Sequence, residues 1–334
     1  MTDKKYRILA IDGGGIKGMI PAAFLASVEQ STGKRIVDHF DLIAGTSTGG
    51  IVALGLGLGM SAAEIVSFYE NDGPRIFSAG PTDTLYRKCM EKLKSMKRSV
   101  RRAYCAKHNP DALKEALIRA FGERILGESQ TRLLIPAFDR QRSTVHVFKT
   151  SHHERLTEDW QRQAVDVALS TAAAITYLPS HRMSDGVSLI DGGVWANNPA
   201  GPSVVEAIGI LKWPMDNIYV LSLGCSEYPL NIPEDPSSVR MMFEASDIFF
   251  QGQSHASLGT AKLLTWQSPH DRRLFRYSPT VPKGAYSLDS AHSIPALKGL
   301  GNSLAREAMP EIRDIFFDVQ RSEFIPFHGI RSTA

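Results

Sequence analysis

Two short glycine-flanked segments carry the side chains that could make or break a covalent bond. The first reads Gly-Thr-Ser-Thr-Gly around Ser47, and the second reads Asp-Gly-Gly from Asp191. A Gly-x-Ser-x-Gly sequence between a strand and a helix turns the chain sharply and presents the serine hydroxyl at a sheet edge. A carboxylate within hydrogen-bond reach can take the proton of that hydroxyl. Each segment alone would also suit a structural turn, but together they predict a nucleophile, Ser47, with Asp191 as its catalytic partner.

A third glycine-rich segment, Asp12-Gly-Gly-Gly-Ile-Lys-Gly, could stabilise negative charge. Gly13, Gly14 and Gly15 free the backbone to direct several N–H groups into one small volume, as an oxyanion hole requires. Removal of one such donor costs roughly 3–4 kcal/mol of transition-state stabilisation. Lys17 adds positive charge, either beside the hole or as a structural clamp on the loop.

The same loop also matches Gly-x-Gly-x-x-Gly, the pattern of dinucleotide-binding sites. Such a site needs an acidic residue about 20 residues further on, at the end of the second strand. Here that strand ends at Gly45, and its acid, Asp41, lies at the opposite end. No Gly-Lys-Ser/Thr follows the loop, which argues against a nucleoside-triphosphate P-loop. The sequence therefore favours an oxyanion loop over a dinucleotide site.

A Ser-Asp-His triad on an α/β-hydrolase fold is another alternative. The histidines that follow Asp191 in the required order are His255, His270, His292 and His328. Those folds place the nucleophile after several strands, whereas one strand precedes the serine-bearing strand here. No His-Glu-x-x-His or similar spacing occurs, so we expect no catalytic metal and no cofactor.

The segments that must position these groups alternate between strand and helix patterns. The expected strands are 6–11, 40–44, 132–138, 144–149, 188–190 and 217–223, and the expected helices are 21–30, 49–58, 111–121 and 157–173. Strand–helix alternation from the first residues predicts an α/β fold with a mainly parallel central sheet. Beyond Pro229 the periodicity weakens and indicates no clear element.

The composition is that of a folded globular protein. The chain has 334 residues, is 43% hydrophobic and 22% charged, and has a net charge of +3. Three separated cysteines argue against a disulfide framework and fit a reducing compartment. The uncharged run from Leu42 to Met60 is nearly long enough to span a bilayer, but its six glycines fit a strand, turn and core helix better. We expect a cytoplasmic protein.

One segment differs in composition from its surroundings. Between Arg87 and Lys107 there are nine Lys or Arg residues and one acid, Glu91. Such a run is usually a solvated helix face. It could also lie on anionic lipid, or bind the phosphates of a regulatory nucleotide. The sequence leaves these three interpretations open.

The three motifs in this order resemble those of the patatin-like phospholipases. The family pattern is Asp-Gly-Gly-Gly-x-Arg/Lys-Gly, then Gly-x-Ser-x-Gly, then a late Asp-Gly-Gly/Ala, and the segments at 170–180 and 197–199 also look similar. The resemblance implies a three-layer α/β/α fold and a Ser-Asp dyad without histidine. Ser47 would attack an ester carbonyl, Asp191 would act as general base, and Gly13, Gly14 and Gly15 would hold the oxyanion. Lys17 stands where many members of the family have arginine, so the positive charge is kept but the bidentate geometry of a guanidinium is lost.

More narrowly, the chain is similar to bacterial phospholipases that act as effectors in antiphage signalling. That resemblance implies activation by a cyclic dinucleotide and attack on membrane phospholipids, with peripheral contact at the inner membrane and no DNA or RNA partner. It divides the chain into a catalytic domain at 1–230, with a basic helical insertion at about 82–122, and a C-terminal extension at 231–334 on the same domain, as lid or regulatory region. An inactive binding module, an acyltransferase and a homo-oligomer remain alternatives to test.

Overall fold

The computed structural model describes residues 4–78, 110–175, 177–230, 238–265, 271–286, 288–289 and 291–329. Its centre is a sheet with strand order β5-β6-β3-β2-β1-β7-β8, and β4 pairs with β3 outside that path. The pairs β1–β2, β1–β7, β2–β3 and β7–β8 are parallel, whereas β3–β4, β3–β6 and β5–β6 are antiparallel. The predicted α/β class with a mainly parallel sheet is confirmed.

The strands of the described residues are short, and most are buried. They are β1 (Tyr6–Ile11), β2 (Leu42–Gly45), β3 (Arg132–Asp139), β4 (Thr144–Lys149), β5 (His181–Arg182), β6 (Ser188–Asp191), β7 (Ile218–Leu223) and β8 (Leu274–Tyr277).

The helices of the described residues cover both faces of the sheet. The α-helices are α1 (Met19–Thr32), α2 (Thr48–Gly57), α3 (Ala62–Ser78), α6 (Pro110–Phe121), α7 (Ala164–Thr171), α8 (Gly193–Ala196), α9 (Ala200–Gly209), α10 (Ser238–Thr265) and α11 (Ile294–Ile312). Shorter helical turns are η1 (Gly15–Gly18), η2 (Ile36–Asp38), η3 (Leu126–Glu128), η4 (Asp159–Gln161), η5 (Met215–Asn217), η6 (Ala291–Ser293) and the π-helical η7 (Arg313–Phe317).

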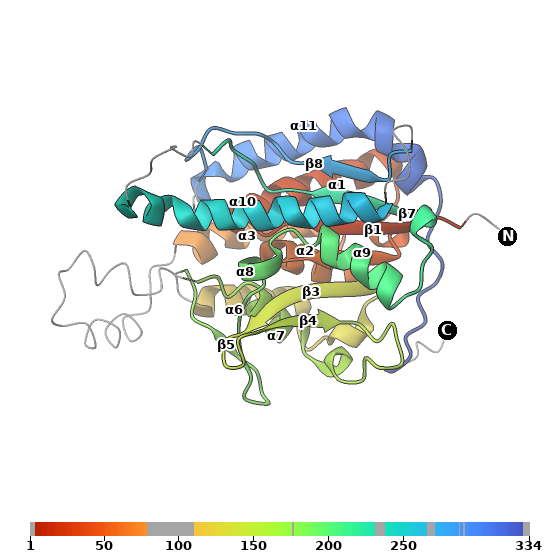
Figure 1. Cartoon of the computed structure of the whole chain (residues 1–334), viewed down its shortest axis with the longest axis horizontal. Helices are drawn as coiled ribbons and strands as arrows, with labels where there is room; N and C mark the ends of the chain where they lie inside the picture. The colour runs from red at the N-terminus through yellow and green to blue at the C-terminus, as the bar shows by residue number, and fades with distance from the viewer. Residues whose placement is uncertain are drawn as a thin grey trace.

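Alternate residues of the strands fill two separate apolar cores. In β1, Leu9 and Ile11 pack with residues of α1, α2, α7 and α11, whereas Ile8 and Ala10 pack with residues of α9 and α10. Successive side chains of a strand point to opposite faces, so a strand buried on both sides reads as a continuous apolar run. Figure 1 shows the resulting three layers, with α8, α9 and α10 on the near side of the sheet.

Most of the elements expected from sequence are confirmed, with one clear correction. The expected helix from Thr157 to Ala173 is wrong, because α7 begins only at Ala164. Asp159–Gln161 form only the short turn η4, and Arg162 and Gln163 after it are extended, since Leu126 N–H donates to the Arg162 carbonyl and Ala164 N–H donates to the Arg124 carbonyl. This backbone pairing with a distant segment displaces the local helical hydrogen bonds.

The C-terminal third, where sequence periodicity was weak, supplies elements to the same layers. β8 extends the sheet beside β7, α11 packs on α1, and α10 packs on α9. The basic segment 87–107 lies outside the described residues, as does most of the insertion at 82–122 except for α6. No helix in the described ranges combines the length and the apolar character needed to cross a membrane.

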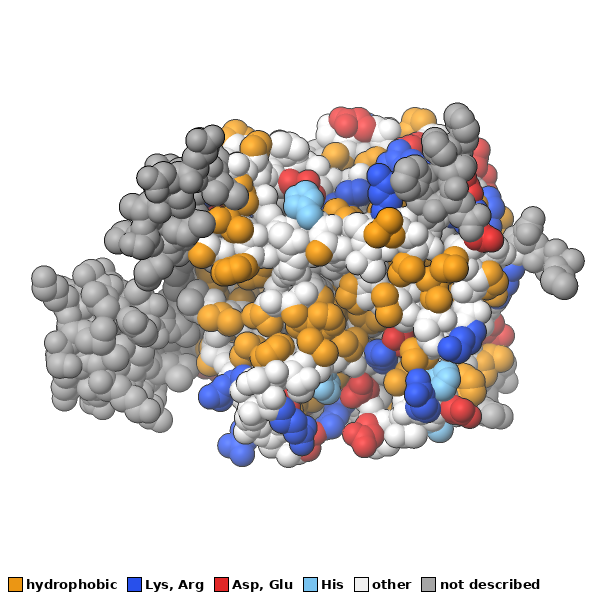
Figure 2. Space-filling view, in the orientation of Figure 1, with side chains coloured by type: hydrophobic (Ala, Val, Ile, Leu, Met, Phe, Trp, Pro, Cys, Tyr) orange, Lys and Arg blue, Asp and Glu red, His pale blue; other side chains and the backbone are white. Residues whose placement is uncertain are grey.

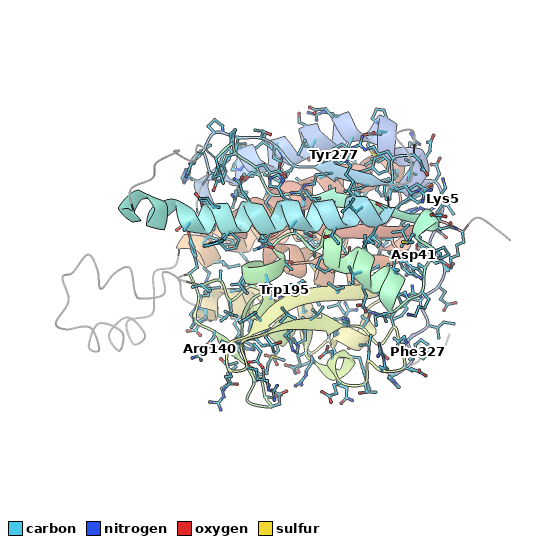
Figure 3. All side chains as sticks on the ribbon, viewed as in Figure 1. Lys5, Asp41, Arg140, Trp195, Tyr277 and Phe327 are labelled. Atoms are coloured by element: carbon cyan, nitrogen blue, oxygen red, sulfur yellow. The ribbon has the colours of Figure 1, made fainter. Side chains whose placement is uncertain are left out.

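The near face of the molecule carries a band of apolar side chains. Figure 2 shows this band across the middle of the face, with Lys and Arg side chains below it. Figure 3, in the same view, shows Trp195 on α8 and Arg140 below Trp195.

Candidate active site

Ser47 and Asp191 converge because β2 and β6 approach each other along the same edge of β3. β2 pairs with β3 as far as Leu134, and β6 pairs with it from Ala137 onward, while β4 occupies the other edge. β2 is parallel to β3 and β6 is antiparallel, so the C-terminal ends of β2 and β6 face each other across a short gap. Ser47 follows β2 by two residues, and Asp191 ends β6.

The backbone at Ser47 forms a strained turn that surrounding groups hold in place. Ser47 has φ 56° and ψ −125°, a conformation that residues other than glycine rarely adopt. Its N–H donates to Thr171 Oγ1 at 3.0 Å, and the Thr171 hydroxyl donates to the Pro136 carbonyl at 2.5 Å. A Cβ at Gly49 would lie 2.4 Å from the Ile11 carbonyl oxygen, so this position requires glycine. A serine with positive φ directly before a helix is the backbone geometry of a nucleophile elbow.

The Asp191 carboxylate is buried beside the Ser47 hydroxyl. Burial raises its pKa to about 6, although hydrogen bonds from the Ser47 side chain and the Gly193 N–H oppose that rise. The Gly193 bond measures 2.6 Å to Oδ1, and the Asp191 N–H donates to the Ala173 carbonyl at 3.0 Å. The carboxylate is therefore ionised at neutral pH, and it is a stronger base than an exposed aspartate.

The glycine loop crosses the same region, but its three amides are not equivalent. Gly13 N–H donates to the Asn197 carbonyl at 3.0 Å, so this amide is already occupied. Gly14 N–H makes a longer bond of 3.3 Å to Thr48 Oγ1, and no described residue accepts a hydrogen bond from Gly15 N–H. The geometry thus differs from the expectation that all three amides face the oxyanion, and it leaves Gly14 and Gly15 as the better candidates.

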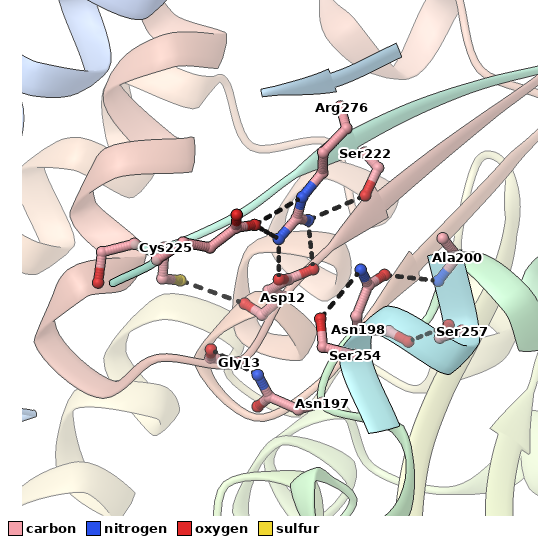
Figure 4. Close-up of polar contacts among 12 residues, drawn as sticks. Asp12, Gly13, Asn197, Asn198, Ala200, Ser222, Cys225, Ser254, Ser257 and Arg276 are labelled. Atoms are coloured by element: carbon pink, nitrogen blue, oxygen red, sulfur yellow. Dashed lines mark hydrogen bonds and ion pairs between the residues drawn. The ribbon is translucent and has the colours of Figure 1, made fainter. Parts of the chain in front are cut away.

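The Asn197-Asn198-Pro199 segment holds this loop against α10. Asn197 Nδ2 donates to the Gly13 carbonyl at 3.3 Å, and Asn197 N–H donates to Gln253 Oε1 at 2.9 Å. Gln253 Nε2 in turn donates to the Gly193 carbonyl, next to Asp191. Figure 4 shows Asn197 beside Gly13, and Asn198 bonded to Ser254 and Ala200. Gln253 of α10 therefore holds the segment that follows Asp191, and Asn197 of that segment holds the glycine loop that follows Asp12.

A buried ion pair anchors the start of the glycine loop. Arg276 on β8 donates to both carboxylate oxygens of Asp12, at 2.9 and 2.7 Å, and also to Ser222 and Glu227 (Figure 4). Burial raises the pKa of Asp12 despite the favourable Arg276 charge, so the carboxylate depends on this partner. Sequence reasoning missed Arg276. A carboxylate directly after a buried strand predicts that some cationic side chain pairs with it, but the sequence does not show which residue supplies the cation.

We expect Arg276→Gln to lower the free energy of unfolding by about 3 kcal/mol or more, because it leaves the Asp12 carboxylate buried without its cation. Urea denaturation of the full chain would measure this loss. Arg272→Gln is the matched control, because Arg272 lies on the same segment but pairs with Glu311 at the surface. That variant should lose about 1 kcal/mol or less. Equal losses in the two variants would contradict the anchoring role of Arg276.

Lys17 contacts the loop after β7 and does not touch either candidate catalytic side chain. Its Nζ donates to Ser226 Oγ at 3.0 Å. Burial lowers the pKa of Lys17, while the nearby Cys225 and Asp247 act in the opposite direction. Of the two roles that the sequence left open, this contact favours the structural clamp.

The late histidines do not supply a third catalytic group in the described residues. His255 and His292 are exposed, and His328 Nε2 contacts the Glu154 carbonyl. His270 lies outside the described residues. Within the described ranges, no cluster of His, Cys, Asp and Glu side chains is placed to hold a metal ion. What the geometry offers is a serine, a carboxylate and backbone donors, which suffice for acyl transfer through a covalent intermediate.

Comparison with known proteins identifies the family of the chain. The family model described as patatin-like phospholipase matches residues 9–204. A cGAMP-activated phospholipase of Pseudomonas aeruginosa is 38% identical over 66% of this chain and 62% of its own length. A cGAMP-activated phospholipase of Vibrio cholerae is 29% identical over 96% of both chains. The solved structure of VipD from Legionella pneumophila aligns at a TM-score of 0.42 and 11% identity, over 91% of this chain and 67% of its own. The chain belongs to the patatin-like phospholipase family.

Proposed function

We propose that this chain hydrolyses fatty-acyl ester bonds of membrane phospholipids through a Ser47–Asp191 dyad, under the control of a cyclic dinucleotide. The observation that carries the proposal is the convergence of Ser47, two residues beyond β2, with the buried Asp191 carboxylate at the end of β6, whose pKa burial raises to about 6. A base with this pKa is ionised at neutral pH and can still accept a proton in the transition state.

The proposed reaction has two halves. Asp191 takes the Ser47 proton as Oγ attacks the ester carbonyl, and the amides of Gly14 and Gly15 stabilise the resulting oxyanion. The C–O bond to the glycerol oxygen then breaks, and Asp191 returns the proton to that oxygen, which releases a lysophospholipid. Water, deprotonated by Asp191, then attacks the acyl-serine, the bond from the acyl carbon to Ser47 Oγ breaks, and Asp191 returns the proton to Oγ as the fatty acid leaves. No metal or cofactor takes part in this scheme.

The proposed control by a nucleotide rests on relatives. The Vibrio cholerae protein that matches along nearly its whole length is named a cGAMP-activated phospholipase. The chain spans 62% of the length of the Pseudomonas aeruginosa relative. We propose that a cyclic dinucleotide such as cGAMP switches the enzyme on in antiviral defence, with the active protein at the inner face of the membrane.

The test is a lipid hydrolysis assay with and without the nucleotide. The purified chain is incubated with vesicles of phosphatidylethanolamine and phosphatidylglycerol, and fatty acid and lysophospholipid are measured by mass spectrometry. We expect equal amounts of both products, formed only when cGAMP is present. Equal rates without cGAMP would contradict nucleotide control and favour a constitutive hydrolase. Appearance of the acyl group on an added alcohol, in place of free fatty acid, would favour an acyltransferase.

A further inference from the structure

An apolar band crosses the near face of the molecule, from α10 over α8 to the β3–β4 hairpin (Figure 2). On α10, the exposed fractions of Phe249 and Phe250 are 74% and 45%. On the hairpin, Val145 is 52% exposed, and its partner across the strands is Phe138. The half-buried Trp195 lies on α8, between these two groups. Folded proteins rarely leave large apolar side chains contiguous on the surface without a function for them.

The band is continuous with the active site. α8 packs against both α10 and β3, and it begins two residues after Asp191. Trp195 Nε1 donates to the Ala137 carbonyl at 2.8 Å, and Ala137 is the residue that pairs with Asp191. Phe249 and Phe250 lie about one helical turn before Gln253, which contacts the Gly193 carbonyl. A surface bound to this band would therefore lie next to the nucleophile.

Positive charge borders the band at the hairpin. Arg140 and Arg142 occupy the exposed turn between β3 and β4, and Arg182 is exposed on the neighbouring β5. Arg142 pairs with Asp139 at 3.5 Å, and Arg140 contacts the Ser188 hydroxyl, so a positive excess remains at this rim. Apolar side chains bordered by arginines are the pattern of proteins that lie on anionic bilayers, with rings in the interface and guanidinium groups at the phosphates.

We propose that this band, made of Phe138, Val145, Trp195, Phe249 and Phe250, docks on an anionic phospholipid bilayer, with Arg140 and Arg142 at the headgroups. The inference rests on the proposed phospholipase function, since it explains how a lipid that resides in a bilayer reaches Ser47. The bilayer fits better than a second copy of the chain, because the arginine rim matches negative headgroups and the band adjoins the site at which lipid is consumed.

The double variant Phe249→Ser/Phe250→Ser tests the docking. Binding is measured by co-sedimentation with phosphatidylethanolamine–phosphatidylglycerol vesicles, in a Ser47→Ala background with cGAMP present, so that the vesicles stay intact. We expect binding to fall about tenfold or more, because burial of one phenylalanine side chain contributes at least that factor. Leu263→Ser is the matched control, because Leu263 is 78% exposed on the same helix, over three turns further along. It should bind like the parent protein.

Activity separates docking from catalysis. With Ser47 intact, the double variant should lose vesicle hydrolysis in parallel with binding, and it should hydrolyse the soluble ester p-nitrophenyl butyrate at the parental rate. Arg140→Gln/Arg142→Gln should weaken binding to anionic vesicles about fivefold per arginine and leave binding to purely zwitterionic vesicles unchanged.

Three results would overturn the proposal. The first is parental vesicle binding by the phenylalanine double variant. The second is an equal loss of butyrate hydrolysis, which would place the rings in the catalytic machinery. The third is a parent protein that is dimeric by analytical ultracentrifugation and a double variant that is monomeric, which would show that a second copy covers the band. If the parent protein hydrolysed neither substrate, the proposed function would fail, whereas co-sedimentation would still test the docking on its own.

Discussion

Replacement of Ser47 by alanine should reduce phospholipid hydrolysis by about 10⁴-fold or more, because it removes the only atom in the scheme that forms the covalent intermediate. The residual rate would come from substrate binding and the backbone donors alone. The measurement is fatty-acid release from vesicles with cGAMP present, together with labelling by a fluorophosphonate probe. The wild-type chain should be labelled, and the Ser47→Ala chain should not.

Ser170→Ala provides the control for this experiment. Ser170 is also a buried serine, but its hydroxyl donates to the Asp166 carbonyl and does not contact Asp191 in the structure. It also precedes Thr171, whose hydroxyl holds the Ser47 amide, so it tests whether a small disturbance nearby is enough to stop turnover. This variant should keep both labelling and hydrolysis. A Ser47→Ala chain that still reacts with the probe would show that another residue is the nucleophile.

The motifs point to candidate site residues because each motif has a local physical meaning. A serine between glycines after an apolar run indicates a tight turn at a strand end. Ser47 has the positive φ that such a turn requires. Both glycines of the motif are needed, because a Cβ at Gly49 would meet the Ile11 carbonyl oxygen and a Cβ at Gly45 would meet the backbone of Gly49. Close backbone approach of this kind leaves a signature in the sequence, since only glycine fits.

The convergence of Ser47 and Asp191 could not be derived from the residues alone. It depends on β6 being antiparallel and pairing with the end of β3 that β2 leaves free. Apolar runs show that strands exist, but they do not show their order or direction. The strand pattern predicted a mainly parallel sheet without saying which strand runs the other way, and a parallel β6 would have placed Asp191 toward the far end of β3, away from Ser47.

The supporting contacts were also hidden in the sequence, for a different reason. Arg276 and Gln253 come from segments with weak periodicity, and each acts through side-chain bonds to partners more than fifty residues away. Such partners are set by the packing of α10 and β8 on the sheet. The same packing places the Asn197 carbonyl where it accepts a hydrogen bond from Gly13 N–H. The glycines of the loop do not predict that bond.

Replacement of Asp191 by asparagine should lower the rate of hydrolysis by about 10²- to 10⁴-fold, because asparagine keeps the shape of the side chain but cannot accept the Ser47 proton. In the wild-type chain, activity should follow the ionised fraction of Asp191. Since burial raises the pKa of Asp191 to about 6, kcat/KM should rise as pH increases toward 6 and level off above it. The measurement is a pH–rate profile with a soluble ester. A profile that stays flat from pH 7 down to pH 5 would contradict the assignment of Asp191 as the base.

The raised pKa of Asp191 also predicts that Asp191→Asn will lose activity without losing stability of the fold. A carboxyl group whose pKa is higher in the folded chain than in the unfolded chain stabilises the fold at low pH, and this contribution is lost as the pH rises through the folded-state value. For Asp191 that window runs from its ordinary value, near 4, up to about 6. At pH 8 the ionised carboxylate therefore destabilises the native state, and Asp191→Asn should melt at the same temperature as the wild type or higher. A carboxylate in a buried position where it weakens the fold is expected at a functional site, and the proposed transfer of the Ser47 proton would account for it. A variant that melted well below the wild type at pH 8 would instead mark Asp191 as a structural residue.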